Sequence, residues 1–180
     1  MTRLSFVLLV CSIASAQEAP QYTNDGQMRL PANYREWIFL SSGLGMTYGP
    51  TGQTNAQGNP NFDNVFANPS AYRAFMKTGS WPDKTVLVLE IRGSDSHVSI
   101  NKGGQIQKEV VAIEVHVKDT ARFKGGWGFF GFEKGDTAKL IPTTASCYSC
   151  HEQHGSVDTT FVQFYPTLID IAKQKGTLKP

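Results

Sequence analysis

Apolar and polar side chains alternate along the middle of the chain, a pattern that predicts a β-sheet. The alternation is clearest over residues 109–118, because successive side chains of a strand point to opposite faces. One face carries branched apolar residues and the other a more polar set, namely Val111, Ile113, Val115 and Val117 against Ala112, Glu114, His116 and Lys118. Apolar and aromatic runs predict further strands over residues 36–40, 62–67, 85–92 and 127–132.

Two segments carry the signals of helix ends instead. Residues 68–79 begin with Asn-Pro, continue with apolar residues at helical spacing and end with Gly, so they predict a helix. A second helix is expected over residues 166–175, which follow an apolar segment and precede a glycine. Residues 41–61 are rich in Gly, Ser, Thr, Asn and Pro and predict a long loop of the kind that borders binding sites. We therefore expect an α+β fold, predominantly an antiparallel β-sheet with a few helices.

The first residues have the features of an export signal. Arg3 precedes an apolar run, and Ala14-Ser15-Ala16 matches the small-residue pattern of a signal-peptide cleavage site. The run is too short for a membrane anchor, and a buried N-terminal helix remains the alternative. We expect a protein that is periplasmic or otherwise exported, with a signal peptide over residues 1–16, an irregular lead-in over 17–33 and a single domain over 34–180.

Composition narrows the class of function. The 180 residues suffice for one domain with a real core, and 40% hydrophobic residues are too few for a membrane bundle. The chain has 17 basic and 15 acidic residues, a balance that lacks the strongly basic surface of a nucleic-acid-binding protein. We therefore expect no nucleic-acid partner.

The most specific chemical signal lies near the C-terminus. Cys147-Tyr148-Ser149-Cys150-His151 has the C-x-x-C-H spacing of c-type haem attachment. At this spacing Cys147 and Cys150 form thioethers to the vinyl groups of one porphyrin, and His151 reaches the iron as the proximal ligand. One motif implies one covalent haem c. A C-x-x-C disulfide and half of a zinc site are the alternatives.

The role of the iron depends on its sixth coordination position. A Met or a second His closes that position in an electron-transfer cytochrome. His116 is the most credible histidine, because it shares a strand face with Glu114, but no candidate is compelling and an open or aromatic-capped distal site is the first expectation. The candidates are Met28, Met46, Met76, His97, His116 and His154.

The sequence resembles the cytochrome P-460 family, which includes the cytochromes c′-beta. Several separate segments carry the resemblance in the same order: Leu30-Pro31, Asn33 to Trp37, Asn68 to Tyr72, Lys77 to Gly79, Thr85 to Val88, Glu114 to Asp119, the C-x-x-C-H motif and Phe164-Tyr165-Pro166. The resemblance implies a β-rich fold that is not a four-helix bundle, a homodimer and a five-coordinate iron.

Within that family the resemblance implies two activities. P-460 proteins oxidise hydroxylamine and carry a lysine cross-link to the porphyrin, whereas c′-beta proteins lack the cross-link and bind nitric oxide or carbon monoxide. At the position expected for the lysine this chain has Leu89, which cannot form the bond. Glu114 matches a carboxylate that acts as a distal proton relay in P-460 proteins. Phe62 and Phe66 are the candidates for an aromatic distal cap.

We therefore expect a mono-haem cytochrome that binds nitric oxide or a similar small nitrogenous ligand and transfers electrons to a redox partner that the sequence does not identify. Hydroxylamine oxidation or weak peroxidase activity is the enzyme alternative, so the sequence leaves open whether the protein is an enzyme. A six-coordinate electron shuttle is the second alternative.

Overall fold

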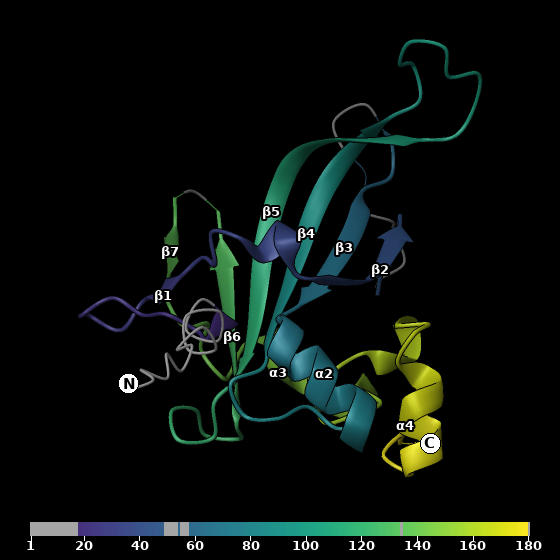
Figure 1. Cartoon of the computed structure of the whole chain (residues 1–180). Helices are drawn as coiled ribbons and strands as arrows, with labels where there is room; N and C mark the ends of the chain where they lie inside the picture. The colour runs from purple at the N-terminus through teal and green to yellow at the C-terminus, as the bar shows by residue number, and fades with distance from the viewer. Residues whose placement is uncertain (1–17, 49–53, 55–57, 134, 180) are drawn as a thin grey trace, which may run out of the picture.

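A five-stranded antiparallel sheet forms the centre of the molecule (Figure 1). The structure is a computed structural model that describes residues 18–48, 54, 58–133 and 135–179. The strands lie in the order β2-β3-β4-β5-β6, with bounds Ile38–Leu44, Phe62–Ala67, Val86–Asp95, Ile106–Lys118 and Trp127–Phe132. A two-stranded sheet pairs β1 (Met28–Arg29) with β7 (Thr137–Ala138). The signal peptide expected over residues 1–16 lies outside the described residues.

Three α-helices accompany the sheet in the described part of the chain: α2 (Pro69–Thr78), α3 (Ser146–His154) and α4 (Ile169–Lys175). Two short 3₁₀ helices, η1 (Tyr34–Glu36) and η2 (Val162–Phe164), connect the larger elements. The expected α+β class with a predominantly antiparallel sheet is confirmed. The described residues contain no helix with the length and apolar character needed to cross a bilayer.

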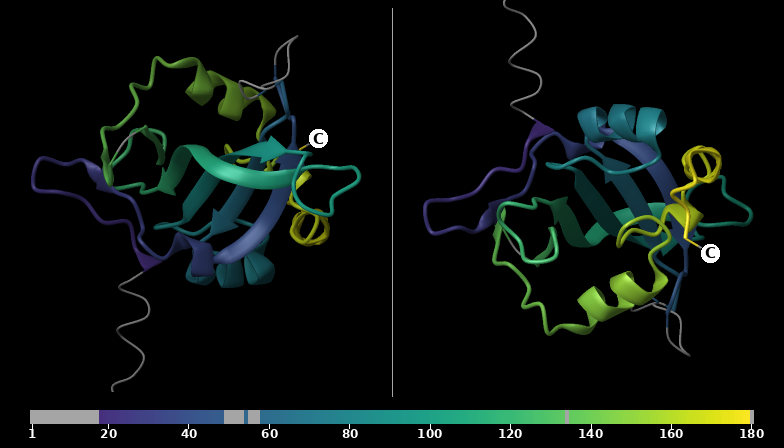
Figure 2. Two further views of the ribbon diagram at one scale, coloured as in Figure 1. Left: turned by 90° about the horizontal axis from the view of Figure 1, so that it is seen from above. Right: turned by 90° about the horizontal axis from the view of Figure 1, so that it is seen from below.

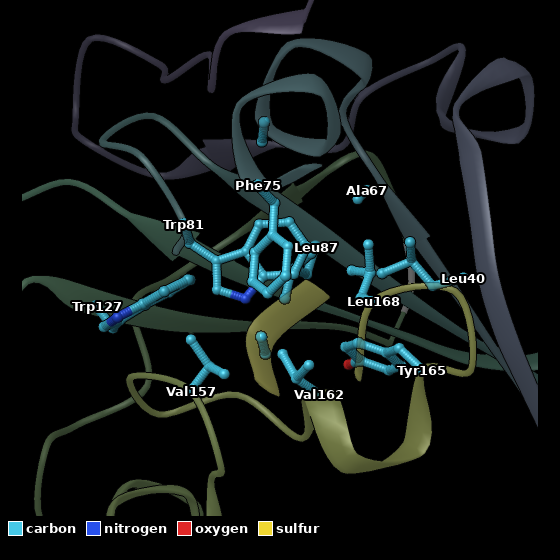
Figure 3. Close-up of a cluster of buried hydrophobic side chains, with 12 residues drawn as sticks. Leu40, Ala67, Phe75, Trp81, Leu87, Trp127, Val157, Val162, Tyr165 and Leu168 are labelled. Atoms are coloured by element: carbon cyan, nitrogen blue, oxygen red, sulfur yellow. The ribbon is translucent and has the colours of Figure 1, made fainter. Parts of the chain in front are cut away.

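The sheet has two covered faces because its side chains alternate. On one face Val86, Val88, Val115 and Val117 pack with Met28 and Phe130 in a buried cluster. On the other face Ala67 and Leu87 pack with Phe75 of α2 and with Leu168, which directly precedes α4 (Figure 3). In this second cluster the rings of Phe75 and Trp81 lie 4.5 Å apart.

Helix α2 begins and ends where the sequence predicts. Gly79 follows it with a φ of 74°, a left-handed conformation that glycine adopts without steric cost. Asn68, at the start, makes no side-chain capping hydrogen bond to the helix backbone. Its Oδ1 instead accepts the N–H of Val86 at 2.9 Å, and its Nδ2 donates to the carbonyl of Lys84 at 3.2 Å. Asn68 therefore joins the start of α2 to the start of β4.

The lead-in, the first strand and α4 are among the elements that differ from the expectation. The lead-in over residues 17–33 contains β1, and its Met28 is fully buried, so this segment is part of the packed domain. The first strand begins at Ile38 rather than at 36 because η1 precedes it, and α4 begins at Ile169 rather than at 166. Strands β4 and β5 extend together beyond the rest of the sheet, and α2, α3 and α4 gather toward its opposite end (Figure 1).

Candidate haem site

Helix α3 carries the C-x-x-C-H motif. Cys147 and Cys150 are three residues apart and therefore share one face of the helix. Both are free thiols with partly buried side chains. Burial raises the pKa of Cys147, so its thiol is protonated at neutral pH. The pair is thus available for attachment to a porphyrin.

His151 follows directly and has a defined orientation. Its Nδ1 lies 2.7 Å from the carbonyl oxygen of Thr159, and because a carbonyl only accepts, Nδ1 carries the hydrogen. The other nitrogen, Nε2, keeps its lone pair for a metal. Burial lowers the pKa of His151, which favours the neutral ring. Phe129 and Phe161 contact the ring with centroids at 4.7 and 4.3 Å.

A cavity of about 480 Å³ opens between α3 and the sheet. Figure 2 shows the chain after β6 arching away from the sheet before it returns through α3. Both thiols and His151 border the cavity from this segment, and β3, β4 and β5 form the opposite wall. Two thiols and an imidazole with a free Nε2 around one largely apolar cavity fit a c-type haem.

The middle of the sheet wall is formed by Leu89. The strand register pairs Leu89 with Val65 on one side and Glu114 on the other, so all three point to the cavity. The described residues that line the cavity include no lysine and no arginine. Burial raises the pKa of Glu114, since its carboxylate loses contact with water.

A second carboxyl group, which the sequence analysis did not single out, also lines the cavity. Asp63 lies on β3 and faces the same side as Val65. Burial, and secondarily the charge of Glu114, raise the pKa of Asp63 to about 6. The alternation over residues 62–67 could have identified Asp63 as a candidate, because it places Asp63 and Val65 on one strand face.

The expected aromatic cap from Phe62 and Phe66 is wrong. These residues alternate with Asp63 and Val65 and therefore lie on the other face of β3, away from the cavity. Phe66 packs there against Tyr34 and Phe39, with ring centroids 5.8 and 5.7 Å apart. The sequence pattern placed the two phenylalanines together correctly but did not identify which face borders the site.

His116 reaches the cavity from β5, next to His151. Its ring stacks on Phe129 at 3.8 Å, lies 4.4 Å from Trp127 and meets the ring of His151 at 4.9 Å. Two imidazoles on opposite sides of one iron would have centroids roughly 6 Å apart, given metal–nitrogen bonds of about 2 Å. His116 therefore does not fit as the ligand opposite His151. Burial lowers its pKa well below the ordinary value, and its Nε2 has no hydrogen-bond partner among the described residues.

Of the remaining candidates for the sixth position, only Met46 lines the cavity in the described part of the chain. Its sulfur lies against Gly43, so close that a Cβ at this position would clash with it. Met28 is buried in the cluster on the other face of the sheet, Met76 is on α2, His97 is in the exposed β4–β5 connection and His154 is at the end of α3.

Tyr48 is an aromatic residue at the cavity that sequence reasoning missed. It lies in the connection after β2, lines the cavity and stacks on Phe161 with centroids 5.6 Å apart. No periodic pattern marks this loop position, so only the folded chain brings Tyr48 to the site.

Comparison with known proteins agrees with this geometry. A family model described as Cytochrome P460 matches residues 31–162, a span from before β2 to η2 that includes the C-x-x-C-H motif. No curated protein matches the chain. Among the described residues, no three His, Cys, Asp or Glu side chains come together as a metal-binding group, the arrangement that the zinc alternative requires.

Proposed function

The chain belongs to the cytochrome P460 family, and from this premise we propose that it is a mono-haem c-type cytochrome that binds nitric oxide or a similar small neutral ligand at a five-coordinate iron. The observation that carries the proposal is the orientation of His151. Its Nδ1 is held by the Thr159 carbonyl, and its Nε2 is left for the iron beside the two thiols.

In this proposal the cysteines and the histidine of the motif have different tasks. Cys147 and Cys150 would hold the porphyrin through thioethers, and Nε2 of His151 would be a nitrogen ligand to the iron. The haem, when bound, supplies an iron that changes redox state and coordinates a diatomic ligand. Leu89 and Val65 make part of the facing wall apolar, beside the carboxyl groups of Asp63 and Glu114.

The charges around the cavity support a neutral ligand over an anion. Glu114 and Asp63 line the cavity, and no described lining residue is a lysine or arginine. A carboxylate in a cavity of low polarity repels anions. A neutral diatomic ligand avoids this repulsion.

Hydroxylamine oxidation is the second candidate function, and Glu114 favours it. A buried carboxyl with a raised pKa is suited to accept a proton from a nitrogenous substrate. Leu89 opposes this function, because a leucine side chain cannot form the cross-link that the family resemblance associates with it. Met46 favours the third candidate, a six-coordinate electron shuttle, because it lines the cavity.

The ferrous optical spectrum of the protein matured with a c-type haem system tests the proposal. An ordinary high-spin five-coordinate Soret band is expected. A strongly red-shifted band, together with a second covalent attachment in the mass spectrum of the haem peptide, would overturn gas binding in favour of the cross-linked enzyme. A low-spin band would favour the electron shuttle.

We also propose that the protein is exported and forms a homodimer. Export is supported by the signal-peptide pattern over residues 1–16, and the dimer by the family resemblance. N-terminal sequencing of the mature protein is expected to begin at Gln17. Light scattering is expected to give twice the mass of the mature chain, and a monomer mass would refute the dimer.

A further inference from the structure

The turn that follows α3 presents the carbonyl that orients His151. Over residues 157–160 the N–H of Thr160 donates to the carbonyl of Val157 at 2.9 Å. Asp158, inside the turn, has a φ of 53°, a left-handed conformation that aspartate, like asparagine, tolerates better than most residues. The Thr160 hydroxyl also donates to the carbonyl of Val157 at 2.7 Å, so the turn is closed by its own residues, and contacts from outside the turn fix its position relative to the sheet.

Lys118 provides one part of that support from the end of β5. Its Nζ donates to Oδ2 of Asp158 at 2.9 Å and to the carbonyl of Trp81 at 2.8 Å. The lysine side chain is 18% exposed and the aspartate 35%, so water screens this ion pair less than a fully exposed one. Nζ of Lys118 also lies over the ring of Trp127, 5.6 Å from its centroid.

Two further contacts hold the same turn. The indole N–H of Trp81 donates to Oγ1 of Thr160 at 2.9 Å, and both residues are buried. Nζ of Lys179, near the C-terminus, donates to the carbonyl of Asp158 at 2.7 Å. Segments from three distant parts of the sequence thus converge on one turn.

The backbone leaves this turn little room to move relative to α3. The N–H of Gly155 donates to the carbonyl of His151 at 2.9 Å. A Cβ at Gly155 would lie 2.6 Å from that carbonyl oxygen and 2.6 Å from the backbone carbon of Thr159. Because of this close approach, a shift of the turn would also shift the end of the helix that carries His151.

We propose that the Lys118–Asp158 ion pair positions the Thr159 carbonyl and thereby sets the strength of the bond between His151 and the haem iron. A hydrogen bond from Nδ1 makes Nε2 a better donor to the metal. Stronger donation stabilises the ferric state and lowers the reduction potential. Lys118 and Asp158 are positioning residues, and the inference rests on the haem ligation proposed above.

Two substitutions test the ion pair. Asp158→Asn removes the charge but keeps a residue type that tolerates a positive φ. Lys118→Met removes the ammonium but keeps an unbranched side chain over Trp127. In both haem-loaded variants the iron–histidine stretching band in the ferrous resonance Raman spectrum is expected to move to lower wavenumber, and the reduction potential is expected to rise.

Matched controls separate this effect from a general loss of charge. Asp170→Asn and Lys173→Met break an exposed ion pair on α4, where Nζ and Oδ1 are 3.3 Å apart, and are expected to leave both quantities unchanged. Lys118→Arg, which keeps a cation at the same position, is expected to restore the band toward the wild-type position.

The outcomes distinguish this inference from the proposed function. If haem is absent from the purified wild-type protein, or His151→Ala leaves the spectrum unchanged, the haem ligation itself is wrong. If wild-type protein shows the iron–histidine band and both ion-pair variants load haem with that band unmoved, only the positioning role is wrong. Should Lys118→Met fail to fold, Asp158→Asn decides the question alone.

Discussion

The rings of His116 and His151 meet edge to face, with centroids 4.9 Å apart and planes at 77°. One ring comes from β5 and the other from α3, so this contact joins the sheet to the helix that carries the haem motif. His116 also stacks on Phe129, and burial lowers its pKa well below the ordinary value. The ring therefore stays neutral and serves as packing beside His151.

Replacing His116 with phenylalanine tests that interpretation. The new ring is expected to keep the stack on Phe129 and to remove the Nε2 that has no hydrogen-bond partner among the described residues. The ferrous spectrum of His116→Phe is expected to stay high-spin with His151 bound. A change from a low-spin wild type to a high-spin variant would show instead that His116 is an axial ligand.

Whether Met46 is a ligand of the iron distinguishes gas binding from electron transfer. Its sulfur packs against Gly43 at the cavity wall, so Met46→Ala is expected to leave the spin state of the iron unchanged. Optical spectra of the ferric and ferrous forms measure this directly. Met76→Ala, at a position on α2 outside the cavity, is the control. A conversion from low-spin to high-spin in Met46→Ala alone would support the six-coordinate shuttle.

Glu114 is expected to link the reduction potential to pH. Burial raises its pKa, so the carboxyl loses its proton above the ordinary range of about 4.3. The negative charge then stabilises ferric iron, and the potential falls as pH rises. Glu114→Gln is expected to reduce this slope in a potentiometric titration, and the remaining slope is expected to come from Asp63, which lines the same cavity. Glu109→Gln, at an exposed position on the same strand, is the control and should keep the wild-type slope.

The alternation of side chains made the sheet and part of the site predictable. A period of two is a local property, so residues 109–118 placed Glu114 and His116 on one strand face without knowledge of the fold, and both line the cavity. The same period grouped Phe62 with Phe66 but did not say which face borders the cavity. Both faces of this sheet are covered by apolar clusters, so composition did not distinguish them.

Contacts between distant segments could not be predicted in this way. Thr159 meets His151 because residues from β5, the connection after α2 and the C-terminus hold its turn. Met28 is buried because β1 pairs with β7, more than a hundred residues later in the chain. The local sequence of these segments does not indicate which distant segments they contact.

Glu90 is expected to stabilise the face of the sheet opposite the cavity. Burial alone would raise its pKa, but hydrogen bonds from Arg92, Tyr34 and Arg35 outweigh burial and lower it. Nε of Arg35 lies 2.8 Å from the carboxylate. Glu90→Gln leaves the arginines without their charged acceptor and is expected to cost about 2–3 kcal/mol.

Urea unfolding followed by circular dichroism measures the effect of Glu90→Gln. The haem spectrum provides an internal control, because Glu90 points away from the cavity and the band positions should not change. Asp170→Asn, at the exposed pair on α4, is expected to cost less than about 0.5 kcal/mol. Equal losses in the two variants would contradict a special role for the buried carboxylate.

Asp63 is expected to make the free energy of unfolding depend on pH. Its pKa is about 6 in the folded protein and 3.8 in the ordinary reference state, with burial as the main cause. Between these values the folded protein binds more protons than the unfolded chain, so stability falls as pH rises through this window. Above pH 6 the charged carboxylate at the cavity destabilises the fold by a constant amount.

Asp63→Asn removes this penalty. The variant and the wild type are expected to be similar in stability at pH 4, where Asp63 is largely protonated in the folded protein, and the variant is expected to gain about 1–2 kcal/mol by pH 7.5 once solvent screening is allowed for. Urea unfolding of the haem-loaded proteins at intervals between these pH values measures the difference. Asp170→Asn, whose side chain is 75% exposed, is expected to show no such trend. A difference between Asp63→Asn and wild type that stays constant with pH would mean that Asp63 keeps an ordinary pKa in the folded protein.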